Sequence, residues 1–139
     1  MPQVLISLYS FSSFPFSGHF QSIKIHLNYN NQELSIIQKT YDLILWLVPI
    51  LGRMPREHRF TLGEKIADNL YEILERLLEA KYSKNKGEIL VKLNPKLSVI
   101  QYQIRLLSDL KLISLKRYDY ASRGLTEIGQ ELGSWLKSL

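Results

Sequence analysis

The chain has 139 residues, a hydrophobic share of 45%, a formal net charge of +5 and no cysteine. This length predicts one domain, and the lack of cysteine excludes disulfides and thiolate metal sites. No run of about 18 apolar residues is free of charge, and no basic signal-peptide start precedes Lys24. We therefore predict a cytoplasmic protein without a membrane-spanning helix. The pI near 9.4 mildly favours a polyanionic partner.

Residues 1–32 differ in composition from the rest of the chain. They are rich in Ser, Phe, Tyr and Asn, and Lys24 is their only charged side chain. A short alternating stretch at 23–27 permits one strand, but the chain offers it no partner strand. We predict a poorly ordered N-terminal extension, with a partner-binding arm as the alternative. Residues 33–139 carry helical patterns throughout and form the predicted bundle domain.

Residues 34–51 are predicted to form a helix with apolar side chains on nearly all sides. One stripe contains Ile37, Tyr41, Ile44, Leu45, Val48 and Leu51, and a second contains Leu43, Leu47 and Ile50 beside Trp46. A small bundle covers one side of such a helix, so we predict that the other side forms a subunit interface. The predicted interface residues are Leu43, Trp46, Leu47 and Ile50, together with Gly129 and Gly133.

Gly52 and Pro55 predict a break after this helix, because glycine commonly ends a helix and proline cannot continue one. The next helix is predicted over 61–82, with Thr61 as its N-cap and Glu64 completing a capping box. Its predicted buried stripe contains Gly63, Ile66, Ala67, Leu70, Ile73, Leu74, Leu77 and Leu78. The opposite face is acidic and is either solvated or turned toward a basic surface; it contains Glu64, Asp68, Glu72, Glu75 and Glu79.

A third helix is predicted to follow the loop at 83–87 and to run to about 112. Its apolar side chains are spaced three and four apart, at Leu90, Leu93, Leu97, Ile100, Ile104 and Leu107. Pro95 interrupts the pattern: either Asn94 caps a new helix that starts at Pro95, or one helix is kinked there. The unbroken apolar spacing favours the kink.

The last helix is predicted over 115–138, with Ser114 as a possible cap. Its apolar side chains are Tyr118, Ala121, Leu125, Ile128, Leu132 and Trp135. Gly129 and Gly133 lie on one side of it and indicate the close approach of another helix. Four helices with short connections predict an all-α fold, an antiparallel up-down four-helix bundle.

Catalytic motifs are missing from the sequence. His58 has Glu57 and Arg59 beside it but no nucleophile or second base, and the other histidines lie within residues 1–32. No Glu-x-x-His pair of the kind that holds di-iron in bundles occurs, and no glycine-rich phosphate loop. We predict a non-enzymatic protein without metal or cofactor.

Basic side chains gather instead at the predicted corners between helices. They are Arg53, Arg56 and Arg59 in the first corner, Lys81, Lys84 and Lys86 in the second, and Lys111, Lys116 and Arg117 in the third. In an up-down bundle the first and third corners share one end. Such clusters bind the phosphates of RNA or DNA without reading the base sequence.

Four stretches carry a further signal: YDLILWL at 41–47, PREHRFTLGEKI at 55–66, RLLSDLKLIS at 105–114 and EIGQELGSWLK at 127–137. In combination they resemble the accessory variability determinant (Avd) proteins of diversity-generating retroelements. These proteins are part of a wider four-helix-bundle group, which includes the proteins encoded in intervening sequences of 23S ribosomal RNA genes. The resemblance covers about residues 34–139.

The resemblance implies a ring-like homopentamer whose basic surface binds nucleic acid and the retroelement's reverse transcriptase, in support of mutagenic copying of a template RNA. The family's basic positions are matched at Arg56, Arg59, Lys65, Arg105, Lys111, Lys116 and Arg117. Pro95 and residues 1–32 depart from the family pattern. The alternative is a structural homo-oligomer of the ribosomal-insert group with another partner. A neighbouring reverse transcriptase gene would separate the two.

Overall fold

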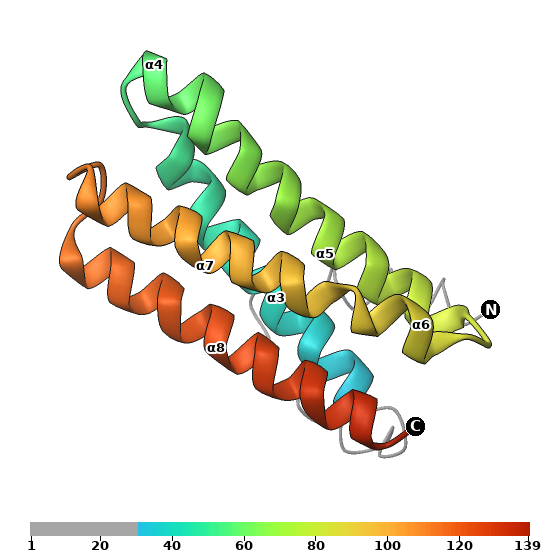
Figure 1. The fold of residues 1–139 in the computed structure, drawn as a ribbon. Helices are drawn as coiled ribbons and strands as arrows, with labels where there is room; N and C mark the ends of the chain where they lie inside the picture. The colour runs from blue at the N-terminus through green and yellow to red at the C-terminus, as the bar shows by residue number, and fades with distance from the viewer. Residues whose placement is uncertain (1–30) are drawn as a thin grey trace, which may run out of the picture.

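The computed structural model describes residues 31–139, and over these residues the chain is helical without a strand (Figure 1). The elements are α3 (Asn31–Gly52), α4 (Arg56–His58), the π-helical turn η2 (Arg59–Gly63), α5 (Glu64–Tyr82), α6 (Lys86–Val91), α7 (Leu93–Asp109) and α8 (Leu115–Lys137). Because α4 and η2 run directly into α5, and α6 into α7, they form four helical segments. The predicted all-α class is confirmed. The predictions for residues 1–30 lie outside the described part of the chain.

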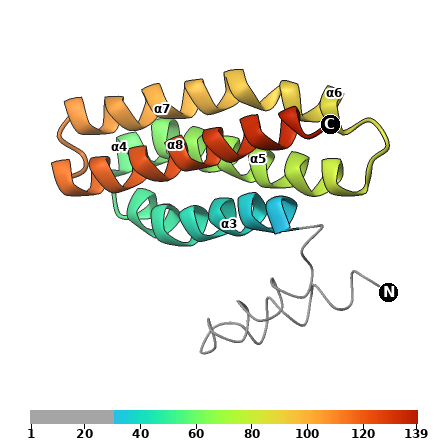
Figure 2. The ribbon, with the colours of Figure 1, turned by 90° about the horizontal axis from the view of Figure 1, so that it is seen from below.

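Each helical segment packs on two others. Both α3 and α7 contact α5 and α8, so α3 and α7 lie across the bundle from one another (Figure 2). The corner between α3 and α4 and the turn between α7 and α8 lie at one end of the bundle in Figures 1 and 2. The turn between α5 and α6 lies at the other end. This arrangement brings two of the three predicted basic corners together.

The core is built from the stripes that the helical spacing predicts. In α6 and α7 the six predicted apolar side chains are all buried, and α5 and α8 bury most of theirs. Each such side chain stabilises the fold by about 1.5–3 kcal/mol relative to an exposed position. The sequence predicts Leu78 in the buried stripe of α5, but its side chain is 37% exposed, so this prediction is wrong.

The inward side of α3 differs from the prediction. Leu43, Leu47 and Ile50 were expected at a subunit interface, but they are 4%, 1% and 6% exposed within the core of a single chain. Trp46 is half-buried, and its ring centroid lies 4.3 Å from that of Tyr120 on α8. The outward side of α3 carries Leu45 instead. When both stripes of a helix are apolar, periodicity gives their spacing but cannot tell which one faces inward.

The composition of α3 bears on the prediction that the chain has no membrane-spanning helix. By length and hydropathy alone, residues Gln32–Gly52 are sufficient to cross a membrane, although 33% of the apolar window is buried in the bundle. Core helices share this composition, and α3 supplies Ile36, Leu47 and Leu51 to the core.

The first corner is shorter than predicted. Helix formation begins at Arg56, directly after Pro55, and passes through the π-helical turn η2 without a break. Thr61 is therefore not an N-cap; its hydroxyl donates to the carbonyl of Glu57 at 2.8 Å from inside the helix. Gly63 packs tightly at the end of η2, because a Cβ there would lie 2.9 Å from Cε of Met54. The Thr-x-x-Glu pattern fits a cap locally, but Pro55 starts the helix earlier.

Pro95 acts one turn before its own position. Its ring nitrogen has no hydrogen to donate to the carbonyl of Val91, and Val91 is where α6 ends. Lys92 alone separates α6 from α7, with helical dihedral angles (φ −75°, ψ −12°). The alternative was a new helix capped by Asn94. It is not observed, because α7 already begins at Leu93.

The last helix starts as predicted. Its N-cap is Ser114, whose hydroxyl accepts the backbone N–H of Arg117 at 3.2 Å. Gly129 and Gly133 make no close contact within residues 31–139, because a Cβ at Gly129 would lie 4.0 Å from Leu97 and one at Gly133 would meet nothing within 4 Å. The predicted interface role of these glycines remains a prediction.

Candidate nucleic-acid interface

One end of the bundle collects most of the predicted basic residues. We call it the basic end: Arg53, Arg56, Arg59, Lys111, Lys116 and Arg117 from the α3–α4 corner and the α7–α8 turn, with Lys65 and Arg105 farther along α5 and α7. All of these are exposed except Arg59, which is half-buried. The two corners come from distant parts of the sequence, and only the fold places them at one end (Figure 1).

The side chains of the basic end are not equally available to a partner. Arg59 donates from Nη1 to the carbonyl of Gly52 at 3.3 Å and so helps to cap α3. Nε of Arg105 lies 3.8 Å from Oδ2 of Asp109, and both side chains of this ion pair are exposed. Such an exposed pair contributes little and exchanges easily for a phosphate. Arg53, Lys116 and Arg117 have no side-chain hydrogen bond or ion pair within residues 31–139.

Lys111 sits in the turn that follows α7. Its φ of 62° is left-handed, a conformation that usually falls to glycine or asparagine at a helix C-terminus. The neighbouring N–H of Leu112 donates back to the carbonyl of Leu107 at 2.8 Å, which ends the helix. The turn borders a surface hollow of about 530 Å³ that Asp109, Lys111 and Arg117 help to line.

The opposite end is a weaker candidate than the sequence predicts. Nζ of Lys86 donates to the carbonyls of Ala80 and Lys81, at 3.0 and 2.7 Å, and so caps the C-terminus of α5. Burial lowers the pKa of Lys81, with Lys86 nearby adding to the effect and Glu33 opposing it. Lys84 remains exposed. Two of the three predicted basic residues here are thus engaged by the protein itself.

The acidic face of α5 is partly neutralised within the chain. Lys96 of α7 lies 2.9 Å from Glu72 and lowers the pKa of this carboxyl through that hydrogen bond. Arg76 lies 2.8 Å from Glu79 on the same helix. The sequence left a solvated face and a face turned toward a basic surface as alternatives. Glu64, Asp68, Glu75 and Glu79 are exposed, which fits the solvated face, and Glu72 pairs with a single lysine of α7.

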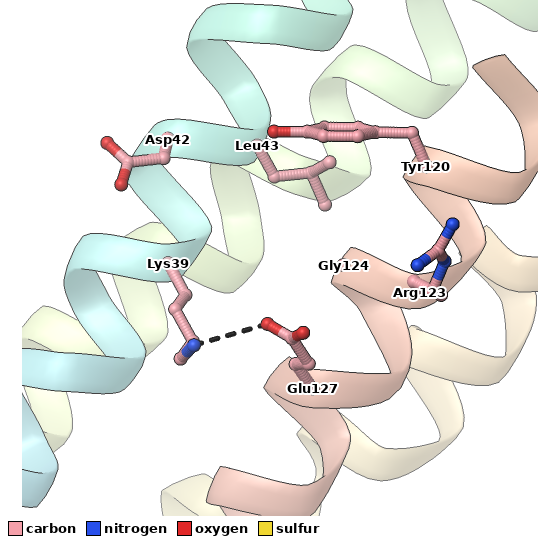
Figure 3. A pocket seen from close by; sticks show the side chains of 7 residues that line it. All are labelled: Lys39, Asp42, Leu43, Tyr120, Arg123, Gly124 and Glu127. Atoms are coloured by element: carbon pink, nitrogen blue, oxygen red, sulfur yellow. Dashed lines mark hydrogen bonds and ion pairs between the residues drawn. The ribbon is translucent and has the colours of Figure 1, made fainter. Parts of the chain in front are cut away.

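A groove of about 340 Å³ between α3 and α8 is the main competing site (Figure 3). Its charged side chains are balanced: Lys39 lies 3.2 Å from Glu127 and 3.6 Å from Glu131, and Arg123 pairs with Asp119 at its rim. The hydrogen bond to Glu127 raises the pKa of Lys39. Leu43 and Tyr120 supply the apolar lining. The ion pairs of Lys39 with Glu127 and Glu131 connect α3 to α8 across this groove.

Metal chemistry finds no support among the described residues. Across 31–139, no group of three or more His, Asp or Glu side chains is arranged to hold a metal ion.

A family model described as bAvd-like matches residues 34–139, most of the chain. The chain belongs to the bAvd-like family. No curated protein matches it. The match confirms the resemblance seen in the sequence, and this family suggests a non-catalytic accessory protein of a diversity-generating retroelement.

One feature of this bAvd-like chain escaped the sequence reasoning. Phe60 is 54% exposed at the basic end, with the guanidinium of Arg59 4.8 Å and that of Arg56 5.6 Å from its ring centroid. A helix that starts at Thr61, as the sequence predicts, leaves Phe60 outside the helix. The spacing of four residues between Arg56 and Phe60 would have indicated the contact, had the helix been started at Pro55.

Proposed function

We propose that this bAvd-like protein is a non-enzymatic accessory protein that binds nucleic acid and a reverse transcriptase, in the cytoplasm, and so supports mutagenic reverse transcription. The observation that carries the proposal is the basic end. It joins two corners that are far apart in the sequence, in a chain whose family suggests a retroelement accessory role.

Phosphate binding is the interaction that this end supports best. Its exposed lysines and arginines lie on helix ends and turns and are not arranged to read base edges. Lys and Arg that neutralise phosphates release condensed counterions, which gives affinity without sequence preference. The acidic residues nearby, among them Glu57, Glu64, Asp109 and Asp119, are fewer than the eight basic ones.

We further propose that the chain assembles into a ring, for which the resemblance implies a pentamer. Support comes from a second apolar face, on α7 and just beyond it: Val99, Tyr102, Leu106 and Leu110 are spaced three and four apart and are 48–68% exposed. Contiguous apolar surface of this kind is typical of an interface. It lies across the bundle from Leu45 of α3, which is 54% exposed.

The placement of these two faces favours a ring over a simple dimer. Since α3 and α7 lie across the bundle from one another, one chain cannot cover its own two faces. Packing α7 of one copy on α3 of the next is a head-to-tail contact, and such contacts form a ring when the rotation between copies closes. Repetition around a ring would also multiply weak phosphate contacts through avidity.

The proposed function is tested by fluorescence anisotropy of a labelled template RNA mixed with the full chain over a series of salt concentrations. We expect binding that weakens steeply with salt and varies little with RNA sequence. Absence of binding at low salt would favour the alternative, a structural homo-oligomer of the ribosomal-insert group with another partner.

A further inference from the structure

The aromatic side chain of Phe60 is exposed and is not part of the hydrophobic core. It is 54% exposed and stands on η2, the π-helical turn at the start of the segment that continues as α5. π-Helical turns are rare and are frequently found at functional sites. The buried side of this turn is closely packed at Gly63. A Cβ on Gly63 would lie 2.9 Å from Cε of Met54 and 3.4 Å from the carbonyl oxygen of His58. The turn thus fixes the direction in which Phe60 leaves the helix.

Two guanidinium groups flank the Phe60 ring. Arg59, at 4.8 Å from the ring centroid, is tied down by its hydrogen bond to Gly52. Arg56, at 5.6 Å, is exposed, and its side chain makes no hydrogen bond or ion pair within residues 31–139. Arg56 can therefore turn from the ring to a phosphate while Arg59 stays in place. Two acidic side chains lie near this site: Glu57, which is 81% exposed and 3.8 Å from His58, and Glu64, which is exposed about one turn beyond Phe60.

We propose that Phe60, with Arg56 and Arg59, is a stacking site for an unpaired base of a single-stranded nucleic acid. The inference rests on the proposed function and adds a substrate class to it: single strands in preference to duplexes. Aromatic rings and guanidinium planes are the surfaces on which splayed-out bases stack, and every base can use them. Arg53 and Arg56 are exposed in the same corner and would take the adjoining phosphates.

The preference for single strands follows from where the bases are. In a duplex the bases are already stacked on one another and paired, so Phe60 can reach none of them without breaking the stack. A duplex offers this corner its phosphates alone. The basic end should therefore bind both single strands and duplexes, and Phe60 should contribute only to the binding of single strands.

The test compares three labelled probes of equal length: a single-stranded RNA, an RNA duplex, and a single strand of abasic sugar-phosphate units. The full chain is used as wild type, Phe60→Leu and Phe60→Trp, with anisotropy as the readout. For Phe60→Leu we expect an affinity loss on the order of tenfold for the single-stranded RNA. Affinity for the duplex and the abasic strand should stay unchanged, and Phe60→Trp should bind the RNA as wild type does.

The salt dependence should be the same in all three proteins, because no charge is altered. Light scattering on the variants separates stacking from a contact between copies of the chain. Wild-type affinity of Phe60→Leu for the single strand, equal losses on duplex and single strand, or a lower particle mass would each overturn the stacking site. If wild type binds none of the probes, the proposed function itself fails.

Discussion

Replacing Arg53 and Lys116 by glutamate should lower RNA affinity on the order of 100-fold at low salt. The two residues come from the two corners that meet at the basic end, and both are exposed. Each replacement removes a phosphate contact and adds a charge that repels the backbone. The variant should also show a flatter dependence of affinity on salt, because fewer counterions are released on binding. Anisotropy with the template RNA measures both quantities.

The matched control changes charge on the acidic face of α5. Asp68→Asn with Glu75→Gln alters two exposed carboxylates on α5, three and ten residues beyond Lys65, and neither has an ion-pair partner within residues 31–139. Glu72 is avoided because it pairs with Lys96. The control should bind RNA at least as well as wild type. Arg59 is a poor choice for such a test, since its loss would also uncap α3. Equal affinities for wild type and Arg53→Glu/Lys116→Glu would remove the basic end from the account.

Glutamate at both Tyr102 and Leu106 should break the oligomer into single chains. These side chains are 68% and 48% exposed on α7, so the fold of the chain should survive, but a charge in a subunit interface must be desolvated. Light scattering should give about five times the 16.2 kDa chain mass for wild type and about the single-chain mass for the variant. Far-UV circular dichroism should be the same for both.

Glutamate at Gln130 and Ser134 is the control for that experiment. Both positions are exposed on α8, outside the apolar faces of α3 and α7, so these charges should leave the oligomer intact. Because they lie next to Gly129 and Gly133, loss of the oligomer in this variant would instead place the contact at those glycines. A wild-type protein that is already monomeric at micromolar concentration would contradict the ring. An oligomer that withstands the Tyr102 and Leu106 changes would place its interface elsewhere.

Periodicity predicted the helices well where one stripe was apolar. In α8 the spacing of three and four residues identified side chains such as Leu125 and Leu132, which are fully buried. Such a stripe has one stable solution, which is to face the core. In α3 two stripes compete, and the choice depends on how α5 and α8 pack around it. The sequence alone therefore placed Leu47 on the wrong side.

The residues of the candidate site and the shared end of its two corners were predictable, but the contacts of the individual side chains were not. The sequence located every basic residue of the corners, yet it could not tell which of them the protein uses for itself. Lys86 and Arg59 bind backbone carbonyls at helix ends, and such contacts depend on the path of the chain in the turn. The π-helical turn under Phe60 was hidden for a similar reason: Thr61 and Glu64 imitate a helix start that Pro55 supplies earlier.

The central claim is that the protein assists reverse transcription by binding the template RNA and the enzyme together. The measurement that tests it most directly is the yield of cDNA when the retroelement's reverse transcriptase copies its template RNA with and without this protein. We predict a yield several times higher with wild type, and a yield with Arg53→Glu/Lys116→Glu that is close to the level without protein. Equal yields in all three reactions would contradict the account.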